Sequence, residues 1–360
     1  MSGTKGISKE GQSIPGEIHL YPWFEDFYQE FVINGVPNSL LIYGEKDIGK
    51  LNFALYLANY LICENKTNHK PCLKCQACRW YSMANHPDFF SILPEDSYHL
   101  LPFAVNPDAV VSTSSEDKKQ SKYIRIDQVR DILSVNELSS YRGGMRVILI
   151  YPVESMRVEA ANCLLKSLEE PAENVFYILV THRLESILPT IRSRCRLLAL
   201  PKPSQELSIP WLSEQAQLSN KSQSEIEALF LEMGRSPLKV LNAIDGNSFN
   251  STFMLNELCS SSSLDHTKFI DLLSHAELSD LLTCLQKWCI DLYMVYSGVS
   301  PRYFPDKQLI LKDKVNKLDI LELNRFLKLL IQELKLTTHP LFPKVQLEAV
   351  LSKYAQLFKS

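Results

Sequence analysis

The chain has 360 residues, 45% of them hydrophobic and 22% charged, and a net charge of -3, which together exclude a largely disordered chain and a strongly basic nucleic-acid-binding protein. This length exceeds one ordinary hydrophobic core, so we expect two or three domains. No window approaches ~20 consecutive apolar residues and residues 1–6 lack the apolar core of a signal peptide, so we expect a soluble, cytoplasmic protein without membrane contact.

The first element is expected at residues 24–31, where aromatic residues fall at helical spacing. Trp23 lies just before it and is expected to pack in the core. A role in base stacking is the weaker interpretation of this tryptophan.

Residues 44–51, with the sequence GEKDIGKL, follow a predicted buried strand at residues 40–43 and precede a predicted helix at residues 53–61. This order is typical of a nucleotide site, in which backbone N–H groups and a lysine bind phosphate oxygens. The last position departs from a working loop, because Mg²⁺ needs a Ser or Thr hydroxyl there and Leu51 has none. We interpret Gly44, Gly49 and Lys50 as a degenerate phosphate loop.

Four of the nine cysteines have the spacing C-x8-C-x2-C-x2-C and are Cys63, Cys72, Cys75 and Cys78. In a reducing compartment this spacing favours a metal site over disulfides, with Cys63 completing a tetrahedron. We predict a structural Zn²⁺ without a catalytic role, because four sulfurs leave no open coordination position. Four unliganded buried thiols are the alternative, and His69 or His86 could in principle replace one sulfur.

The predicted strand at residues 146–150 ends where phosphate-loop ATPases carry an Asp that holds Mg²⁺ and a Glu that polarises water. Tyr151 and Pro152 occupy these places. Together with Leu51 they remove both metal ligands and the water-positioning carboxylate, so we predict no ATP hydrolysis. Glu154 is close in sequence, but the helix expected to start there should carry it away from the strand end. Its substitution for the missing carboxylate is the weaker alternative.

Further strands are predicted at residues 89–93, 175–181 and 196–200, with helices between them. Alternating strands and helices of these lengths predict an α/β fold with a parallel sheet covered on both faces. Residues 94–122 are polar and predicted to be an insertion. Three short helices are expected at residues 205–245, and the apolar spacing beyond residue 247 is mostly helical.

Residues 164–171 (LLKSLEEP) and 191–195 (IRSRC) resemble the clamp-loader branch of the AAA+ ATPases, whose signature is the Ser-Arg-Cys motif. The cysteine module after a defective loop, with residues 21–23 (YPW) and 86–88 (HPD), is similar to the delta-prime family of bacterial DNA polymerase III subunits. The resemblance covers residues 21 to about 245.

The resemblance implies three domains. These are an AAA+ RecA-like domain at residues 1–200 with an inserted zinc module at about 63–78, a three-helix lid at 201–246, and an all-α collar for oligomerisation at 247–360.

It also implies a non-hydrolysing clamp-loader subunit of the polymerase holoenzyme, in a hetero-pentamer with gamma/tau ATPase subunits and a delta subunit. Such an assembly uses ATP to load a sliding clamp onto primed DNA during replication. Arg194 would act in trans as an arginine finger, because a guanidinium stabilises charge on a transferring phosphate. A surface ion pair is the alternative for Arg194.

Two rival functions stay open. The first is an active AAA+ ATPase or nucleotide-binding switch. The second is a zinc-dependent nucleic-acid module, which the near-neutral charge disfavours. The sequence leaves open whether Gly49 and Lys50 retain weak nucleotide binding, what the zinc module contacts, and whether the chain touches DNA directly.

Overall fold

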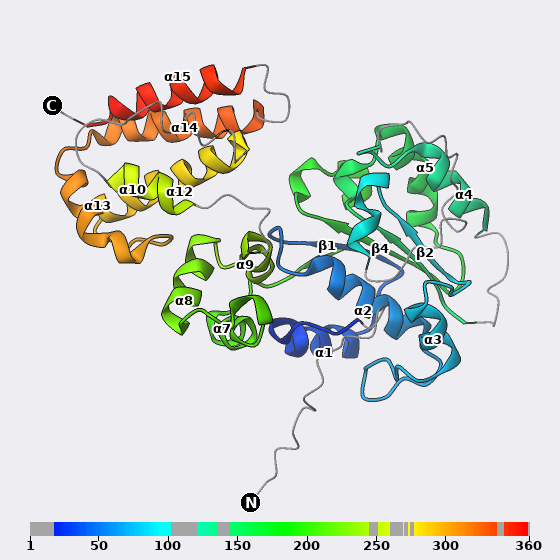
Figure 1. The fold of residues 1–360 in the computed structure, drawn as a ribbon. Helices are drawn as coiled ribbons and strands as arrows, with labels where there is room; N and C mark the ends of the chain where they lie inside the picture. Colours follow the sequence, from blue (N-terminus) through cyan, green and yellow to red (C-terminus); the bar gives the residue numbers. More distant parts are fainter. Residues whose placement is uncertain are drawn as a thin grey trace, which may run out of the picture. The chain divides into compact units, whose positions relative to one another are not determined.

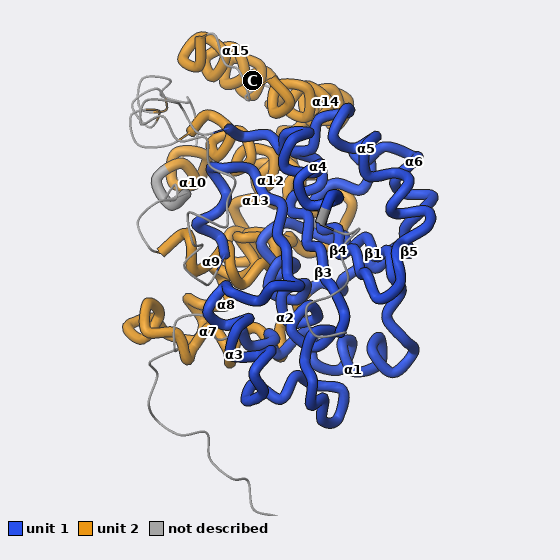
Figure 2. The backbone as a smooth tube through the Cα atoms, turned by 90° about the vertical axis from the view of Figure 1, so that its right-hand side faces the viewer, with its two compact units in different colours: residues 1–202 blue, residues 203–360 orange. Residues whose placement is uncertain are grey.

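The computed structural model describes residues 18–101, 121–135, 144–244, 251–259, 269, 273, 277–336 and 342–358. Most of the predicted insertion, residues 102–120, lies outside the described residues. The chain divides into two compact units, residues 1–202 and 203–360, which have different colours in Figure 2.

The first unit is built on a five-stranded parallel sheet with the strand order β2-β3-β4-β1-β5 (Figure 1). Its strands are β1 (Ser39–Tyr43), β2 (Phe89–Ile92), β3 (Arg146–Ile150), β4 (Val175–Thr181) and β5 (Arg196–Ala199). Its helices are η1 (Pro22–Phe24), α1 (Glu25–Ile33), α2 (Lys50–Ile62), α3 (Gln76–Ser82), η2 (Glu95–Leu100), α4 (Ile126–Val135), η3 (Val153–Ser155), α5 (Val158–Glu169), η4 (Leu184–Ser186) and α6 (Pro189–Arg192). The predicted α/β fold class is confirmed.

Helices cover both faces of this sheet. All residues of β3 are buried, as expected for a nearly continuous apolar strand in a parallel sheet. On one face, Ile148, Ile150 and Leu179 share a core with α4, α5 and α6. Side chains alternate along a strand, so the intervening residues face α2, which contacts β1, β3 and β4. The central strands therefore place the ends of β1, β3 and β4 at one edge of a rigid core.

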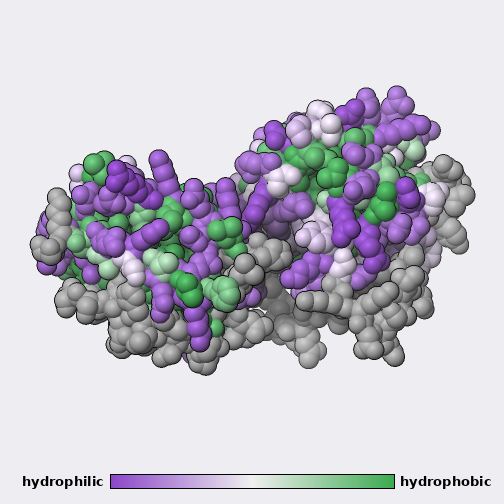
Figure 3. Space-filling model, turned by 90° about the horizontal axis from the view of Figure 1, so that it is seen from above, coloured by the Kyte–Doolittle hydropathy of each residue, from purple (hydrophilic) through white to green (hydrophobic). Residues whose placement is uncertain are grey.

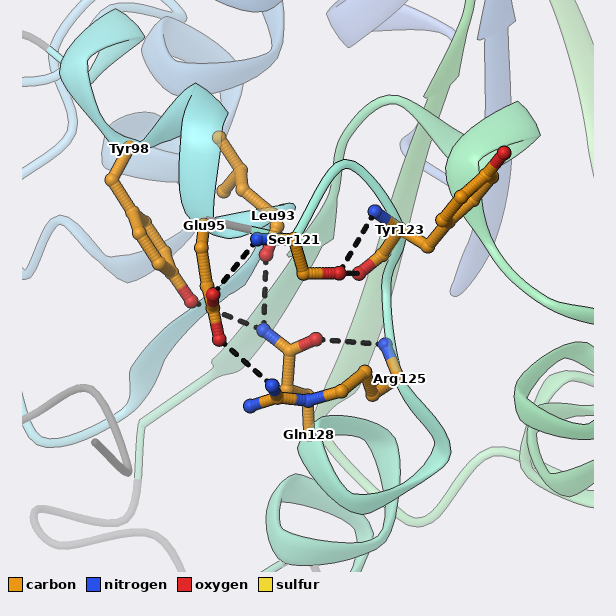
Figure 4. A network of polar contacts seen from close by, with 7 residues as sticks. All are labelled: Leu93, Glu95, Tyr98, Ser121, Tyr123, Arg125 and Gln128. Carbon is orange, nitrogen blue, oxygen red and sulfur yellow. Dashed lines mark hydrogen bonds and ion pairs between the residues drawn. The ribbon is translucent and has the colours of Figure 1, made fainter. Parts of the chain in front are cut away.

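A polar network closes the base of the predicted insertion (Figure 4). Gln128 Oε1 accepts a hydrogen bond from the Arg125 backbone N–H at 2.8 Å, and Gln128 Nε2 donates to the Leu93 carbonyl at 3.0 Å. The Arg125 guanidinium forms an ion pair with Glu95 at 2.9 Å. These contacts hold the residues before and after the segment 102–120 side by side.

The second unit is helical. Its helices are α7 (Gln205–Ser213), η5 (Ala216–Leu218), α8 (Gln223–Glu232), α9 (Pro237–Ile244), α10 (Ser251–Cys259), α12 (Leu278–Tyr296), η6 (Pro305–Lys307), α13 (Gln308–Val315), α14 (Ile320–Leu336) and α15 (Pro343–Ala355). The predicted helical character of the C-terminal region is confirmed. Within the described ranges, none of the helices combines the length and the apolar character needed to span a bilayer.

The described residues of the second unit form two hydrophobic cores. One core, formed by α7, η5, α8 and α9, is centred on Phe230. The other is larger, involves α10, α12, α13, α14 and α15, and contains Trp288, whose Nε1 donates a hydrogen bond to Tyr354 Oη at 2.8 Å. The division of the chain into three domains at residues 200/201 and 246/247 stays a prediction.

Large apolar side chains are exposed on the last two helices and just before α15. Figure 3 shows apolar and polar side chains interspersed over these C-terminal helices. The exposed residues include Leu321, Ile331, Leu336, Phe342 and Val345. A role of these helices in oligomerisation stays a prediction.

Candidate functional site

The phosphate loop lies between β1 and the start of α2, and aromatic residues from the N-terminal segment pack on it. Gly49 is the N-cap of α2 and has a φ of 99°, a left-handed conformation that glycine adopts without strain. A Cβ atom at this position would lie 2.5 Å from Cδ2 of Tyr21. The indole Nε1 of Trp23, which is buried as expected, donates a hydrogen bond to the Ile48 carbonyl at 3.0 Å. The loop is therefore fixed from outside by two aromatic rings.

The ammonium group of Lys50 bonds to its own loop. Lys50 is 3% exposed, and its Nζ donates a hydrogen bond to the carbonyl oxygen of Gly44 at 2.9 Å and another to that of Glu45. An ammonium has three donors, so two of them are used within the loop. Burial lowers the pKa of Lys50 to about 8, against the opposing effect of nearby carboxylates. The structure thus brings the predicted residues Gly44, Gly49 and Lys50 together, with the lysine satisfied by backbone oxygens.

The ends of β3 and β4 complete this edge of the sheet. The Tyr151 hydroxyl lies 3.1 Å from Nε2 of His182, and their rings pack edge to face. Burial and the nearby Lys50 cation lower the pKa of His182 to about 4, so this imidazole is neutral at pH 7. Neither Leu51 nor Pro152 carries a side-chain oxygen. A working ATPase has metal ligands at two of these positions. Here one position holds the aliphatic side chain of Leu51, and the other holds the Tyr151 phenol, which pairs with His182.

Glu154 stays at the strand ends, and the expectation that a helix would carry it away is wrong. Residues 153–155 form the single turn η3, and α5 begins only at Val158. The Glu154 carboxylate accepts hydrogen bonds from Thr181 Oγ1 at 2.7 Å and from the His182 backbone N–H at 2.9 Å. Because β3 and β4 are neighbours in the sheet, this carboxylate ties the two strand ends together.

The four predicted cysteine ligands meet in one cluster. Their Sγ atoms all lie within 4.8 Å of one another, with the closest pairs at 3.9 Å (Cys63 and Cys75) and 4.0 Å (Cys72 and Cys78). In tetrahedral zinc sites Zn–S bonds of about 2.3 Å separate the sulfurs by about 3.8 Å. The cluster could therefore hold a metal ion of this kind.

Backbone geometry supports thiolate charge at the cluster. The N–H groups of Cys72, Cys75 and Cys78 donate to the Sγ atoms of Cys63, Cys72 and Cys75 at 3.3, 3.3 and 3.4 Å. Burial acts to raise the pKa of Cys72, but hydrogen bonds from the backbone N–H groups of Lys74 and Cys75 lower it to about 6. Burial raises the pKa values of Cys63 and Cys78, so among these three only the pKa of Cys72 is shifted toward the thiolate form. Such second contacts orient ligands and increase their affinity for a metal.

The two histidines considered as replacement ligands lie outside this cluster of described residues. Asn68 and His69 have φ values of 48° and 59°, typical of a two-residue type I′ turn between Thr67 and Lys70. His86 accepts a hydrogen bond at Nδ1 from the Asp88 backbone N–H at 3.1 Å, in agreement with a role in the turn.

The segment that follows the last two cysteines is anchored to the sheet domain. Tyr81 on α3 is fully buried, and its hydroxyl donates to the Leu55 carbonyl of α2 at 2.8 Å. Its ring packs against Phe89 of β2 with the ring centroids 4.8 Å apart. The cysteine module is therefore coupled to the core of the first unit.

Arg194 lies between α6 and β5, and its side chain is 29% exposed. Its Nε and Nη2 donate to Oε2 of Glu169, the last residue of α5, at 2.9 and 2.8 Å. Its Nη1 donates to the Thr190 carbonyl at 3.1 Å. None of these partners belongs to the phosphate loop or to the strand ends. The surface ion pair foreseen as an alternative is present in this chain, and the guanidinium remains accessible to solvent.

A family model described as "DNA polymerase III, delta subunit" matches residues 22–204, about half of the chain. The chain belongs to this family. The resemblance seen in the sequence is thus confirmed, and all the delta-family site residues named above, from the loop to Arg194, lie within the matched segment.

Several curated relatives of the chain are named DNA polymerase III subunit delta'. The one from Pseudomonas aeruginosa is 33% identical over 220 residues, which are 61% of this chain and 60% of the relative. The one from Escherichia coli K12 is 27% identical over 238 residues, which are 65% and 64% of the two chains. The match thus spans about three fifths of the length of these relatives.

A solved structure of a DNA polymerase III gamma subunit-related protein from Thermotoga maritima aligns with 92% of this chain and 98% of its own, at 17% identity and a TM-score of 0.40. This similarity is too weak to support an inference about the chain.

Several contacts of the site escaped the sequence reasoning, including those of His182 and three others. These three are the contact of Tyr21 with Gly49, the hydrogen bonds from the end of β4 to the Glu154 carboxylate, and the ion pair of Glu169 with Arg194. The position of His182 could have been noticed in the sequence, because it directly follows the predicted strand 175–181. That strand pairs with the one that ends before Tyr151, so the two side chains lie at the same edge of the sheet.

Proposed function

We propose that the chain is a clamp-loader subunit of the DNA polymerase III holoenzyme that does not hydrolyse ATP. It would join gamma/tau ATPase subunits and a delta subunit in a hetero-pentamer that loads a sliding clamp onto primed DNA. Membership of the delta-subunit family supports this role, as does a relative named DNA polymerase III subunit gamma from Buchnera aphidicola, 29% identical over 176 residues. This work would take place in the cytoplasm, and DNA would be met through the assembly.

The observation that carries the proposal is the hydrogen bond from Lys50 to the carbonyl of Gly44 within its own loop. A lysine at this position in a working site neutralises phosphate oxygens. Leu51 and Pro152 offer no metal ligand, and the Tyr151 hydroxyl faces His182. These residues do not fit Mg·ATP, so binding and hydrolysis of ATP by this chain are not expected.

Arg194 would supply the part of this chain in ATP chemistry. Its guanidinium is partly exposed and lies on a turn outside the phosphate loop, so a neighbouring subunit could reach it. A guanidinium placed on the γ-phosphate of a neighbour's ATP stabilises the charge that develops there. A subunit without its own metal ligands could complete the active site of another in this way.

The cysteine cluster would hold a structural Zn²⁺. Its four sulfurs fit tetrahedral coordination, and Tyr81 connects the module to α2 and β2. When bound, the ion would contribute folding energy and no open coordination position. The lid at residues 201–246 and the collar at 247–360 would serve assembly.

Reconstitution tests the proposal. The chain is mixed with gamma/tau and delta subunits of the same organism, and the complex is purified by gel filtration and assayed for ATP turnover with clamp and primed DNA. We expect a stable complex whose turnover falls when this chain is left out. Failure to co-purify, or turnover that does not depend on the chain, would overturn the proposal.

Glu154 is the observation that favours the rival function, an active ATPase or nucleotide switch. Its carboxylate interacts electrostatically with Lys50 at the strand ends, near where a metal carboxylate would be needed. Phosphate release by the isolated chain separates the two functions. Turnover of Mg·ATP that Lys50→Ala abolishes would support the rival and contradict our proposal.

A further inference from the structure

The guanidinium of Arg194 is held in one orientation by groups of its own chain. Glu169 Oε2 accepts from both Nε and Nη2, at 2.9 and 2.8 Å, and the Thr190 carbonyl accepts from Nη1 at 3.1 Å. A guanidinium has five N–H groups, so two remain for another partner, one on each terminal nitrogen. The side chain is thus fixed while part of its donor edge stays available.

The location of this pair argues against a mainly stabilising role. The side chain of Glu169 is 59% exposed and that of Arg194 is 29% exposed. Ion pairs as exposed as this contribute little to folding because water and salt screen them. Their effect on orientation is different, since a long arginine side chain otherwise samples many rotamers, and donors that are already oriented lose less freedom when they bind.

We propose that Glu169 is a positioning residue for Arg194. Together with the Thr190 carbonyl it would orient the guanidinium so that the two remaining N–H groups face the phosphate of a nucleotide held by a neighbouring subunit. This inference rests on the proposed function of Arg194. It adds that α5, through its last residue, controls the geometry of the finger.

The proposal predicts different effects for different replacements of Glu169. Alanine removes the acceptor, so the guanidinium becomes free to rotate. Glutamine keeps one oxygen in place and retains part of the orientation, although it removes the charge. Glu170 is the next residue, is exposed, and does not bond Arg194, so Glu170→Ala is a matched control that removes the same charge from the same helix end.

The experiment uses the reconstituted loader with clamp and primed DNA, and measures kcat and KM for ATP. Glu169→Ala is expected to lower turnover about 3- to 10-fold at the one site that Arg194 serves, so the kcat of the whole loader should fall by most of the share of that site, with little change in KM, because orientation matters most in the transition state. Glu169→Gln is expected to stay within about 2-fold of the wild type, as is Glu170→Ala. Gel filtration of each variant loader checks that assembly is intact.

A double variant separates this inference from the proposed function. If Glu169 acts through Arg194, then adding Glu169→Ala to Arg194→Ala causes no further loss. Unchanged turnover for Arg194→Ala would overturn the proposed function itself. A loss for Arg194→Ala with none for Glu169→Ala would overturn only the positioning role. Faster turnover of Glu169→Ala would likewise refute it, since the carboxylate would then restrain the arginine.

Discussion

Asp88 and Arg146 form a buried ion pair at the start of the sheet, with 3.0 Å between Oδ1 and Nη2 and side-chain exposures of 3% and 5%. Asp88 Oδ1 also accepts from Arg146 Nε at 3.3 Å, and the Asp88 carbonyl accepts from the Val147 backbone N–H at 2.9 Å. The segment 86–88 therefore joins β2 to β3 by the charge of Asp88 as well as by backbone hydrogen bonds.

Replacing Asp88 by Asn should destabilise the first unit by about 3–5 kcal/mol, because a buried guanidinium loses the carboxylate charge of Asp88. Urea unfolding monitors the effect. Glu322→Gln, which breaks an exposed pair with Arg325, should cost no more than about 1 kcal/mol and serves as the control. Equal losses in the two variants would show that burial of the Asp88 pair is unimportant.

Gly49→Ala should be more destabilising than Gly35→Ala. Both glycines have positive φ values, 99° and 88°, so alanine pays a similar backbone cost of about 1–2 kcal/mol at each. A Cβ at Gly35 meets no atom within 4 Å, whereas at Gly49 it would lie 2.5 Å from the Tyr21 ring. Thermal unfolding of the two variants measures the difference. Adding Tyr21→Ala to Gly49→Ala should recover the part due to the clash, and no recovery would contradict this contact.

Lys50 should give the chain a stability that rises between pH 8 and 10.5. Its pKa is lowered from 10.5 to about 8 by burial, so the folded chain releases this proton at a lower pH than the unfolded chain does. In that window the unfolded state binds more protons, and stability therefore increases with pH by at most about 1.4 kcal/mol per unit. Below pH 8 the contribution is constant.

Lys50→Met removes this titration, so the free energies of unfolding of wild type and variant are compared at pH 7.5, 9 and 10. Effects of other titrating groups cancel in the difference. We expect the wild type to gain on the variant by up to about 3 kcal/mol across the window. A difference that does not change with pH would show that the pKa of Lys50 is not lowered.

Serine at Cys72 and Cys75 should abolish binding of one Zn²⁺ per chain and lower the melting temperature of the first unit. Serine oxygens are poor substitutes for thiolates, and structural zinc contributes folding energy directly. Elemental analysis of the purified proteins gives the zinc content. Cys163→Ser, a partly buried cysteine outside the cluster, should keep the metal. Wild-type protein without zinc would refute this prediction.

Arg194→Ala should leave the loader assembled but reduce its ATP turnover. Arginine fingers contribute about 10³-fold or more at the site they serve, while the other sites of the proposed pentamer would keep their own. The total ATP turnover of the loader should therefore fall at least by the part that this one site contributes. Arg192→Ala is the matched control, because Arg192 is an exposed arginine two residues before Arg194, at the end of the short helix α6. The same loss in both variants would point to a general effect of charge.

The sequence predicted the parts of this structure that depend on local pattern. The strand at residues 175–181 has the predicted bounds, because a continuous apolar run between a Pro-containing turn and a polar turn leaves little freedom. The four cysteines meet as expected, since two x2 steps leave the thiolates few other arrangements.

Contacts between distant segments could not be predicted in this way. Glu154 was expected in a helix because residues 154–158 have no strong breaker, yet hydrogen bonds from Thr181 and His182 hold it in a single turn. The pairing of Glu169 with Arg194 depends on how α5 packs against α6, and no periodicity within either segment encodes it.

The bond between the Lys50 ammonium and the loop carbonyls has a consequence for how such chains evolve. If the lysine and glycine keep the turn that connects β1 to α2 in its shape, selection for folding could preserve them even if, as proposed, the chain does not hydrolyse ATP. The nucleotide-binding pattern of the loop would then reflect what the connection from β1 to α2 requires of its backbone, whether or not the loop binds a nucleotide.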